Sequence, residues 1–286
     1  MKYGLSTRLF SVEYLGSALL DRIIEAGFRE IEICAAREHL DYHDAQRVRD
    51  VGLWFSDRGV ALHSLHAPPC SESGSGRRGG LVVSIAHLER RHRIASMDEI
   101  KRVLEVAERL PYRYLVLHVG LDDEEYSLEK FDAAFTSLEH LRIFAKERGV
   151  RLLLENTANG LGTPARLIDF LQYTRLDDVG ICFDAGHAHL GGALTESLKL
   201  LQARMACAHL HDNDGEKDDH RLPFEGGIDW AQFLPDLASA AGAIDGFCAF
   251  LELRERAAEP VTLQEIRTAA RKLEALEREP AEEIRD

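Results

Sequence analysis

Short apolar runs alternate with longer amphipathic segments along almost the whole chain. The amphipathic segments, such as SALLDRIIEAG and FDAAFTSLEHLRIFAKERG, repeat apolar residues at i, i+3, i+4 and i+7, which is the helical period. Several of these segments end at Gly27, Gly59 or Gly149, and Asp98 and Thr163-Pro164 are expected helix starts. The eight apolar runs have the length of buried strands: residues 2–6, 30–34, 60–66, 114–120, 151–157, 180–186, 206–212 and 247–253.

This alternation predicts an α/β fold with a parallel sheet, and eight units fit a closed (β/α)8 TIM barrel. A doubly wound open sheet is the competing architecture. No G-x-G-x-x-G follows the first run, which weakens a dinucleotide-binding interpretation. We expect a single domain over residues 1–276, with a long Gly/Ser/Arg-rich loop at 67–93 after the third strand and a charged C-terminal tail at 277–286.

Composition narrows the class of function. A chain of 286 residues, 45% of them hydrophobic, is long enough for one large core. Its net charge of −14 argues against a passive nucleic-acid binder, because phosphate neutralisation needs a positive face. No apolar stretch reaches membrane-spanning length. An odd number of cysteines without C-x-x-C suggests a reducing compartment, so we expect a cytoplasmic protein without a membrane segment. The cysteines, four of them in apolar runs typical of buried thiols, are Cys34, Cys70, Cys182, Cys207 and Cys248.

Histidine, aspartate and glutamate gather at the ends of six of the eight runs. In a parallel barrel the chemistry lies at the C-terminal strand ends, and side chains two apart on a strand share a face. His209 and His211 should therefore point the same way, while neighbours such as Leu154 and Phe183 should face the helices. The polar residues at the strand ends are His66, His118, Glu155, Asp184 with His187, His209 with His211, and Glu252.

Each of these residues alone has a simple structural interpretation. A lone strand histidine is more often a core residue than a ligand, and a lone buried carboxylate can pair with an arginine. At one end of six strands, however, a shared divalent cation explains the whole set with one cause. Imidazole together with carboxylate suits Zn²⁺, Mn²⁺, Fe²⁺ or Co²⁺, and the sequence does not choose among them.

Four motifs resemble the xylose isomerase-like barrel superfamily over roughly residues 2–275: LLLENT, CFDAGHAHLGG, HLHDNDG…DDH…GGIDW and FLEL. That superfamily includes sugar isomerases, sugar 3-epimerases and the endonuclease IV group. In the isomerase and epimerase branch, one divalent ion is held by Glu, Asp, His and Glu from the last four strands. The resemblance therefore implies Glu155, Asp184, His211 or His209, and Glu252 as metal ligands.

The resemblance leads to a first functional hypothesis, a divalent-metal-dependent sugar or sugar-phosphate isomerase or epimerase. Such an enzyme transfers a proton through a metal-stabilised enediolate. Glu155 and Glu252 would exchange the proton, and His187 resembles a substrate-contacting histidine. Lys217 stands roughly where ketose epimerases carry a substrate-binding arginine, which leaves the exact sugar open. Further expected substrate contacts are His66, His118, Arg221 and Trp230, the last of which also suits packing at a helix start.

The endonuclease IV branch supplies an alternative, a multi-zinc phosphodiesterase acting on abasic DNA or another phosphate ester. A third possibility is a barrel that binds a sugar without turnover. We expect one divalent ion with up to three possible, a small sugar or sugar phosphate as partner, no nucleic acid, and a homo-oligomer as the family implies. The residues that resemble the nine ligands of three zinc ions are His66, His118, Glu155, Asp184, His187, His209, Asp218, His220 and Glu252.

Overall fold

The protein forms the predicted closed barrel. The computed structural model describes residues 1–69, 81–122, 124–255 and 260–278. Each strand pairs in parallel with the next one in the chain, and β8 closes the barrel onto β1. Every apolar run contains one strand: β1 (Lys2–Ser6), β2 (Ile31–Cys34), β3 (Leu62–His66), β4 (Tyr114–Leu117), β5 (Arg151–Glu155), β6 (Gly180–Asp184), β7 (Met205–Leu210) and β8 (Cys248–Leu251).

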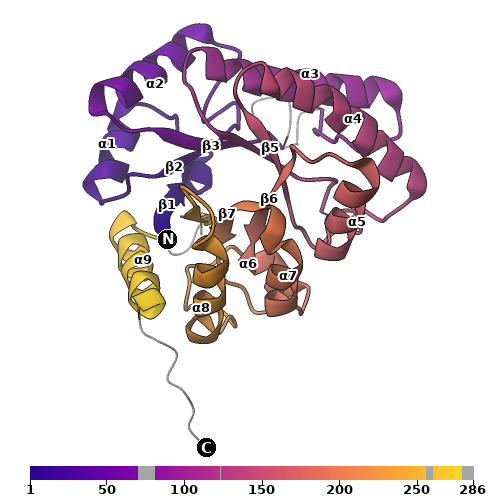
Figure 1. The fold of residues 1–286 in the computed structure, drawn as a ribbon. Helices are drawn as coiled ribbons and strands as arrows, with labels where there is room; N and C mark the ends of the chain where they lie inside the picture. Colours follow the sequence, from indigo (N-terminus) through magenta and orange to yellow (C-terminus); the bar gives the residue numbers. More distant parts are fainter. Residues whose placement is uncertain (70–80, 123, 256–259, 279–286) are drawn as a thin grey trace, which may run out of the picture.

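Helices surround the strands, and α9 lies beside the first strand near the N-terminus (Figure 1). The described ranges also contain three short 3-10 helices, η1 (Thr7–Phe10), η2 (Val106–Glu108) and η3 (Gln202–Arg204). The helices are α1 (Ser17–Glu25), α2 (Ala45–Arg58), α3 (Arg90–Glu105), α4 (Leu128–Lys146), α5 (Pro164–Thr174), α6 (Ala185–Leu190), α7 (Leu194–Leu201), α8 (Trp230–Ala241) and α9 (Leu263–Arg278).

Helix ends follow the sequence signals with one exception. Gly27, Gly59 and Gly149 lie just past α1, α2 and α4 with φ of 95°, 61° and 71°, a conformation that glycine adopts without strain. Pro164 opens α5 behind the N-cap residue Thr163, as predicted. The predicted start at Asp98 is wrong, because α3 begins at Arg90.

The early start of α3 has a packing cause. Ser96 and Met97, which precede Asp98, already belong to its buried face. The helix therefore takes residues 90–93 from the expected loop at 67–93, whose positions 70–80 lie outside the described residues. At the other end of the chain, α9 runs through Arg278 into the expected tail, and residues 279–286 are not described.

A small apolar cluster lies inside the barrel. Cys182, Cys207, Phe250 and their neighbours form a small cluster inside the strands, and a Cβ at Gly4 would collide with the Phe250 ring. The expected outward residues, among them Leu154 and Phe183, are buried in the larger core between strands and helices. This arrangement leaves the C-terminal mouth of the barrel for polar groups.

Four of the cysteines, Cys34, Cys182, Cys207 and Cys248, are free and buried, as predicted, and Cys70 lies outside the described residues. Within the described ranges, no helix is both long and apolar enough to cross a membrane.

Candidate metal centre

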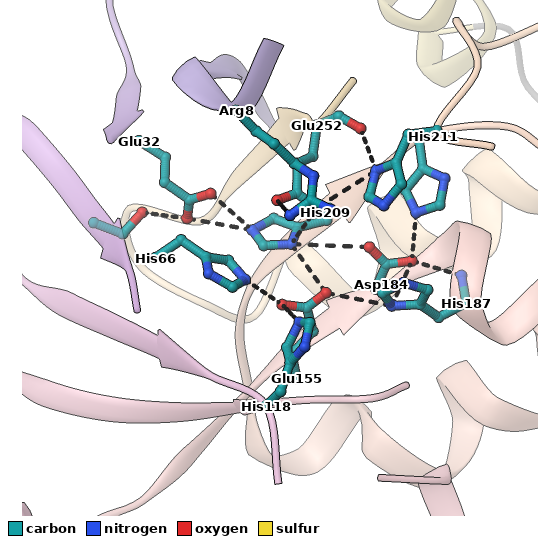
Figure 2. Close-up of polar contacts among 12 residues, drawn as sticks. Arg8, Glu32, His66, His118, Glu155, Asp184, His187, His209, His211 and Glu252 are labelled. Carbon is teal, nitrogen blue, oxygen red and sulfur yellow. Dashed lines mark hydrogen bonds and ion pairs between the residues drawn. The ribbon is translucent and has the colours of Figure 1, made fainter. Parts of the chain in front are cut away.

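Ten of the predicted site residues meet at the mouth of the barrel in three groups, two of which share Glu155. The central group consists of Glu155, Asp184, His209 and Glu252, which come from β5, β6, β7 and the residue after β8 (Figure 2). His209 Nδ1 lies 3.4 Å from Glu155 Oε1, 3.8 Å from Asp184 Oδ2 and 3.5 Å from Glu252 Oε2. All four side chains are buried. The last four strands thus bring one imidazole and three carboxylates together.

Each residue of the central group has one polar atom without a hydrogen-bond partner in the described part of the chain. These atoms are Glu155 Oε1, Asp184 Oδ2, His209 Nδ1 and Glu252 Oε1. Burying such atoms unpaired is costly, and three buried carboxylates side by side repel one another. A divalent cation would satisfy all four atoms. The donor set suits Zn²⁺, Mn²⁺, Fe²⁺ or Co²⁺, so the residues present fit the metal that we expected.

The geometry also distinguishes His209 from His211, which the sequence left open. His209 Nε2 lies 3.1 and 3.2 Å from the two oxygens of Glu32, so this nitrogen donates to Glu32 and Nδ1 faces the central group. His211 Nε2 lies 3.1 Å from Asp184 Oδ1, so both histidines approach Asp184 as the alternation predicted. His211 is grouped instead with His187, Asp218 and His220.

The carboxylates of the central group are ionised. Burial raises the pKa of Glu155, but His118 and His209 beside it hold that pKa well below its ordinary value. Burial likewise raises the pKa of Glu252, and His209 with Arg8 lowers it by more. Burial also raises the pKa of Asp184, and His187 with His211 lowers it by more. Three negative charges therefore persist in a buried place at neutral pH, which is an environment that attracts a cation.

Two further groups adjoin the central one. Glu155 Oε2 lies 3.0 Å from His66 Nε2 and 3.2 Å from His118 Nε2, so Glu155 belongs to two groups. Asp218 Oδ2 lies 3.1 Å from His220 Nε2, and its Oδ1 lies 3.5 Å from His187 Nε2. We call His66, His118 and Glu155 the first group, and His187, His211, Asp218 and His220 the third group.

Three of these histidines are oriented in the same way. The Nδ1 atoms of His66, His187 and His220 lie 3.1, 3.0 and 2.9 Å from backbone carbonyl oxygens. Donation from Nδ1 leaves each Nε2 lone pair directed at a carboxylate oxygen of Glu155 or Asp218. A lone pair that faces a carboxylate needs a proton or a metal ion between them, and a backbone-held Nδ1–H is the usual arrangement of metal-binding histidines.

Three predicted substrate contacts lie elsewhere. Lys217 is exposed in the loop after β7. Arg221 forms ion pairs with Asp214 and Asp219. Trp230 is buried at the start of α8, where its indole donates to Asp212 at 2.8 Å. None of the three lines either hollow at the mouth, so the structure does not bring them to the three groups.

Sequence reasoning missed three residues of the site. Glu32 orients His209, as described above. Asn156 ties β5 to β6, since its amide donates to the Asp184 carbonyl and accepts from the Asp184 N–H, both at 2.8 Å. Arg8, in η1, places NH1 3.8 Å from Glu252 Oε1 (Figure 2). Glu32 left a signal in the sequence, a charge in the middle of the apolar run EIEIC, and Asn156 belongs to the motif LLLENT, but Arg8 left none.

Two hollows open beside the groups and share Arg8, His118 and Asp122 as lining residues. The larger, of about 630 Å³, has an apolar wall that includes Ile85 and Leu117. The smaller, of about 370 Å³, is lined by polar residues that include His187, Asp218, His220 and Glu252. Both are of a size that fits a small polar ligand.

Comparison with known proteins connects this geometry to a family. The sequence model described as "Xylose isomerase-like TIM barrel" matches residues 20–277. The uncharacterized protein y4fM of Sinorhizobium fredii is 31% identical over 245 residues, which cover 77% of this chain and 76% of that protein.

Solved structures share the fold over nearly the full length. A D-tagatose 3-epimerase-like protein is 22% identical with a TM-score of 0.75, and the match covers 96% of this chain and 97% of that one. The IOLI protein, whose structure has a bound zinc atom, is 20% identical with a TM-score of 0.76 and coverage of 97% and 98%. At these identities the structural matches establish the fold.

Proposed function

This chain belongs to the xylose isomerase-like TIM barrel family, and we propose that it is a divalent-metal-dependent isomerase or epimerase of a sugar or sugar phosphate. The observation that carries the proposal is the central group, in which four buried side chains each present an atom with no hydrogen-bond partner within the described ranges. The epimerase-like and zinc-containing structures that share the fold support the same class of reaction.

Glu155, Asp184, His209 and Glu252 would hold the ion. A bound divalent cation supplies a Lewis acid that makes a C–H bond next to a carbonyl more acidic. Glu32 keeps His209 Nδ1 directed at the centre, and Asn156 fixes the position of Asp184 through the backbone. The chain's contribution to the ion is therefore a prearranged set of donors on rigid strands.

Proton transfer would fall to Glu155 and Glu252. Both are ionised and buried, and they come from strands three positions apart in the barrel, so they approach the centre from different sides. One carboxylate takes the proton next to the substrate carbonyl, and the other returns a proton to the same or the opposite face. His187, which lines the smaller hollow, would hydrogen-bond a substrate oxygen.

The test combines substrate-dependent solvent exchange with three variants. Wild-type protein loaded with Mn²⁺, Co²⁺ or Zn²⁺ should incorporate deuterium from the solvent into one member of a panel of ketoses and ketose phosphates. Glu155→Gln and Glu252→Gln should each lower the exchange by about 100-fold or more, because each loses its base. Glu196→Gln, an exposed carboxylate on α7, should leave it unchanged. Full exchange in both active-site variants would refute the proposal.

A second function is favoured by a separate observation, the first and third groups. Together with the central group they form three candidate ligand sets, which suits a phosphodiesterase with two or three zinc ions. Elemental mass spectrometry distinguishes the two functions. About one ion per chain favours the isomerase or epimerase. Two or three ions per chain favour the hydrolase. In that case Asp218→Ala and His220→Ala should each lose one ion and lose phosphodiester hydrolysis.

A further inference from the structure

Arg8 places a positive charge at the mouth of the barrel. It follows β1 in the turn η1, and it lines both hollows together with His118 and Asp122. Its side chain is 28% exposed, so it is mostly enclosed but remains reachable from the hollows. Among the residues that the structure describes, no other lysine or arginine lines both hollows.

The backbone beneath Arg8 is firmly held. The preceding residue, Thr7, is buried, and its Oγ1 accepts from the Cys34 N–H at 3.0 Å and contacts His39 Nε2 at 2.8 Å. His39 in turn lies 2.6 Å from the Glu13 carbonyl oxygen. Arg8 therefore projects from a fixed point of the first strand end, which is the condition for a specific contact rather than a mobile surface charge.

The guanidinium of Arg8 forms no hydrogen bond within the described ranges. It forms an ion pair with Glu252, but the distance of 3.8 Å from NH1 to Glu252 Oε1 is too long for a hydrogen bond. Neighbouring arginines differ. Arg254 donates to the Asp218 carbonyl at 2.9 Å, and Arg221 is bound to Asp214 and Asp219. Arg8 thus has donors available where a ligand would lie.

A guanidinium presents five N–H donors in a planar fork, which matches a phosphate or a carboxylate. A neutral hydroxyl matches the fork less well, because it has a single oxygen and no charge and so forms neither the two parallel bonds nor the ion pair. The acidic side chains around Arg8 would repel an anion, but a divalent ion in the central group offsets that charge. The anion would then lie over Arg8 with the rest of the ligand directed toward Glu155 and Glu252.

We propose that Arg8 determines substrate specificity by binding the anionic group, a phosphate or a carboxylate, of a sugar derivative whose reacting carbons lie at the central group. This inference rests on the proposed function for the nature of the rest of the substrate. It replaces Lys217 and Arg221, which lie away from the hollows, as the residue that holds a phosphate.

Binding to the metal-loaded protein tests the proposal by calorimetry. The probes are ribulose 5-phosphate against ribulose, glucuronate against glucose, and inorganic phosphate alone. Arg8→Gln should weaken the binding of the preferred anionic probe by about 10-fold to 100-fold and leave its neutral counterpart unchanged. Arg8→Lys keeps the charge and loses the fork, so its affinity for the anionic probe should lie between those of the wild type and Arg8→Gln. The control is Arg204→Gln, because Arg204 is 27% exposed and pairs with Asp177 at the opposite end of the barrel.

The outcomes separate this inference from the proposed function. If the binding of ribulose 5-phosphate and of inorganic phosphate depends on Arg8, the anionic group of the substrate is a phosphate. If the binding of glucuronate depends on Arg8, that group is a carboxylate. Equal affinity of the wild type for charged and neutral probes overturns the inference, even when a neutral sugar is turned over. Equal weakening of both probe types in Arg8→Gln and Arg8→Lys also overturns it. Arg8-dependent anion binding without any sugar turnover would leave the inference standing and remove the isomerase proposal.

Discussion

The carboxylate of Glu32 and the imidazole of His209 face each other inside the barrel, with Nε2 3.1 and 3.2 Å from the two carboxylate oxygens. Both side chains are fully buried, and Ser64 Oγ donates to Glu32 at 2.7 Å. Burial raises the pKa of Glu32, but His209 lowers it by more, so Glu32 is charged. The pair fixes which nitrogen of His209 is free to bind a metal, although Glu32 lies outside the central group.

Glu32→Gln should therefore weaken metal binding without removing a ligand. The amide still accepts from His209 Nε2 but lacks the charge that increases the basicity of the ring, so we expect affinity to fall by about 10-fold or more. Competition with a colorimetric chelator measures this. Glu30→Gln, which removes a partly exposed carboxylate paired with Lys2, is the matched control. Unchanged affinity in Glu32→Gln would mean that His209 needs no such partner.

Removal of the metal should destabilise the fold. Without a cation, Glu155, Asp184 and Glu252 repel one another inside the mouth. Metal present at about 100 times its Kd raises the free energy of unfolding by about 2.7 kcal/mol. For a chain of this size, that corresponds to a rise of roughly 5 °C or more in Tm. Thermal unfolding with and without a chelator, followed by titration of metal back into the sample, measures the shift. The double variant Glu155→Gln/Glu252→Gln should lose most of this metal-dependent shift in Tm. A wild-type Tm that does not change when the metal is removed would contradict the assigned site.

Gly186→Ala should displace His211. A Cβ at Gly186 would collide with the His211 ring, and that ring stacks on His220 at 3.8 Å between centroids. Overpacking of this kind costs about 1–3 kcal/mol, which urea denaturation resolves. Gly191→Ala at the end of the same helix is the control, because there the nearest atom to a new Cβ is 3.5 Å away. Equal stability of the two variants would show that His211 can move freely.

The stability of the fold should fall as pH drops from about 6.5 to 4, in part because of His39. Burial lowers the pKa of His39 to about 4, despite the Glu13 carbonyl beside it. Since the unfolded histidine titrates near 6.5, the unfolded chain takes up a proton in this range that the folded chain excludes. This one residue lowers the free energy of unfolding by about 3 kcal/mol once the pH has fallen through the whole range.

Urea denaturation across that pH range, with two histidine variants, isolates this contribution. His39→Gln should be less stable at pH 7 and show a shallower pH dependence. Some dependence remains from His63, whose pKa burial also lowers to about 4. His140→Gln, on the exposed face of α4, should follow the wild-type curve. An unaltered slope in His39→Gln would contradict the neutral, buried state of this ring.

The sequence predicted the barrel because its signals are local. Buried strands of a parallel barrel are short apolar runs, and glycine past a helix end reports a backbone conformation, as at Gly59 and Gly149. The start of α3 was mispredicted because Asp98 resembles an N-cap, whereas burial of Ser96 and Met97 extends the helix back to Arg90. Tertiary packing outweighed the local signal there.

The gathering of the candidate ligands at the mouth was predictable to a similar degree, and the residues that support them were not. Strand alternation placed His209 and His211 on one face, but only the position of Glu32 on a distant strand distinguishes them. No unusual sequence feature marks Arg8, which follows the first strand. Closure of the barrel pairs β1 with β8 and thereby brings Arg8 close to Glu252. A contact between strands that are far apart in the chain leaves no pattern in either strand.

That closure has a consequence for biosynthesis. β8 joins β1 edge to edge, and Glu252 and Arg8 reach the mouth from strands at opposite ends of the described chain. A ribosome must therefore release the chain through β8 and Glu252 before the central group is complete. Chains that stop before β8 would lack a full set of ligands, so metal capture would report that the barrel has closed.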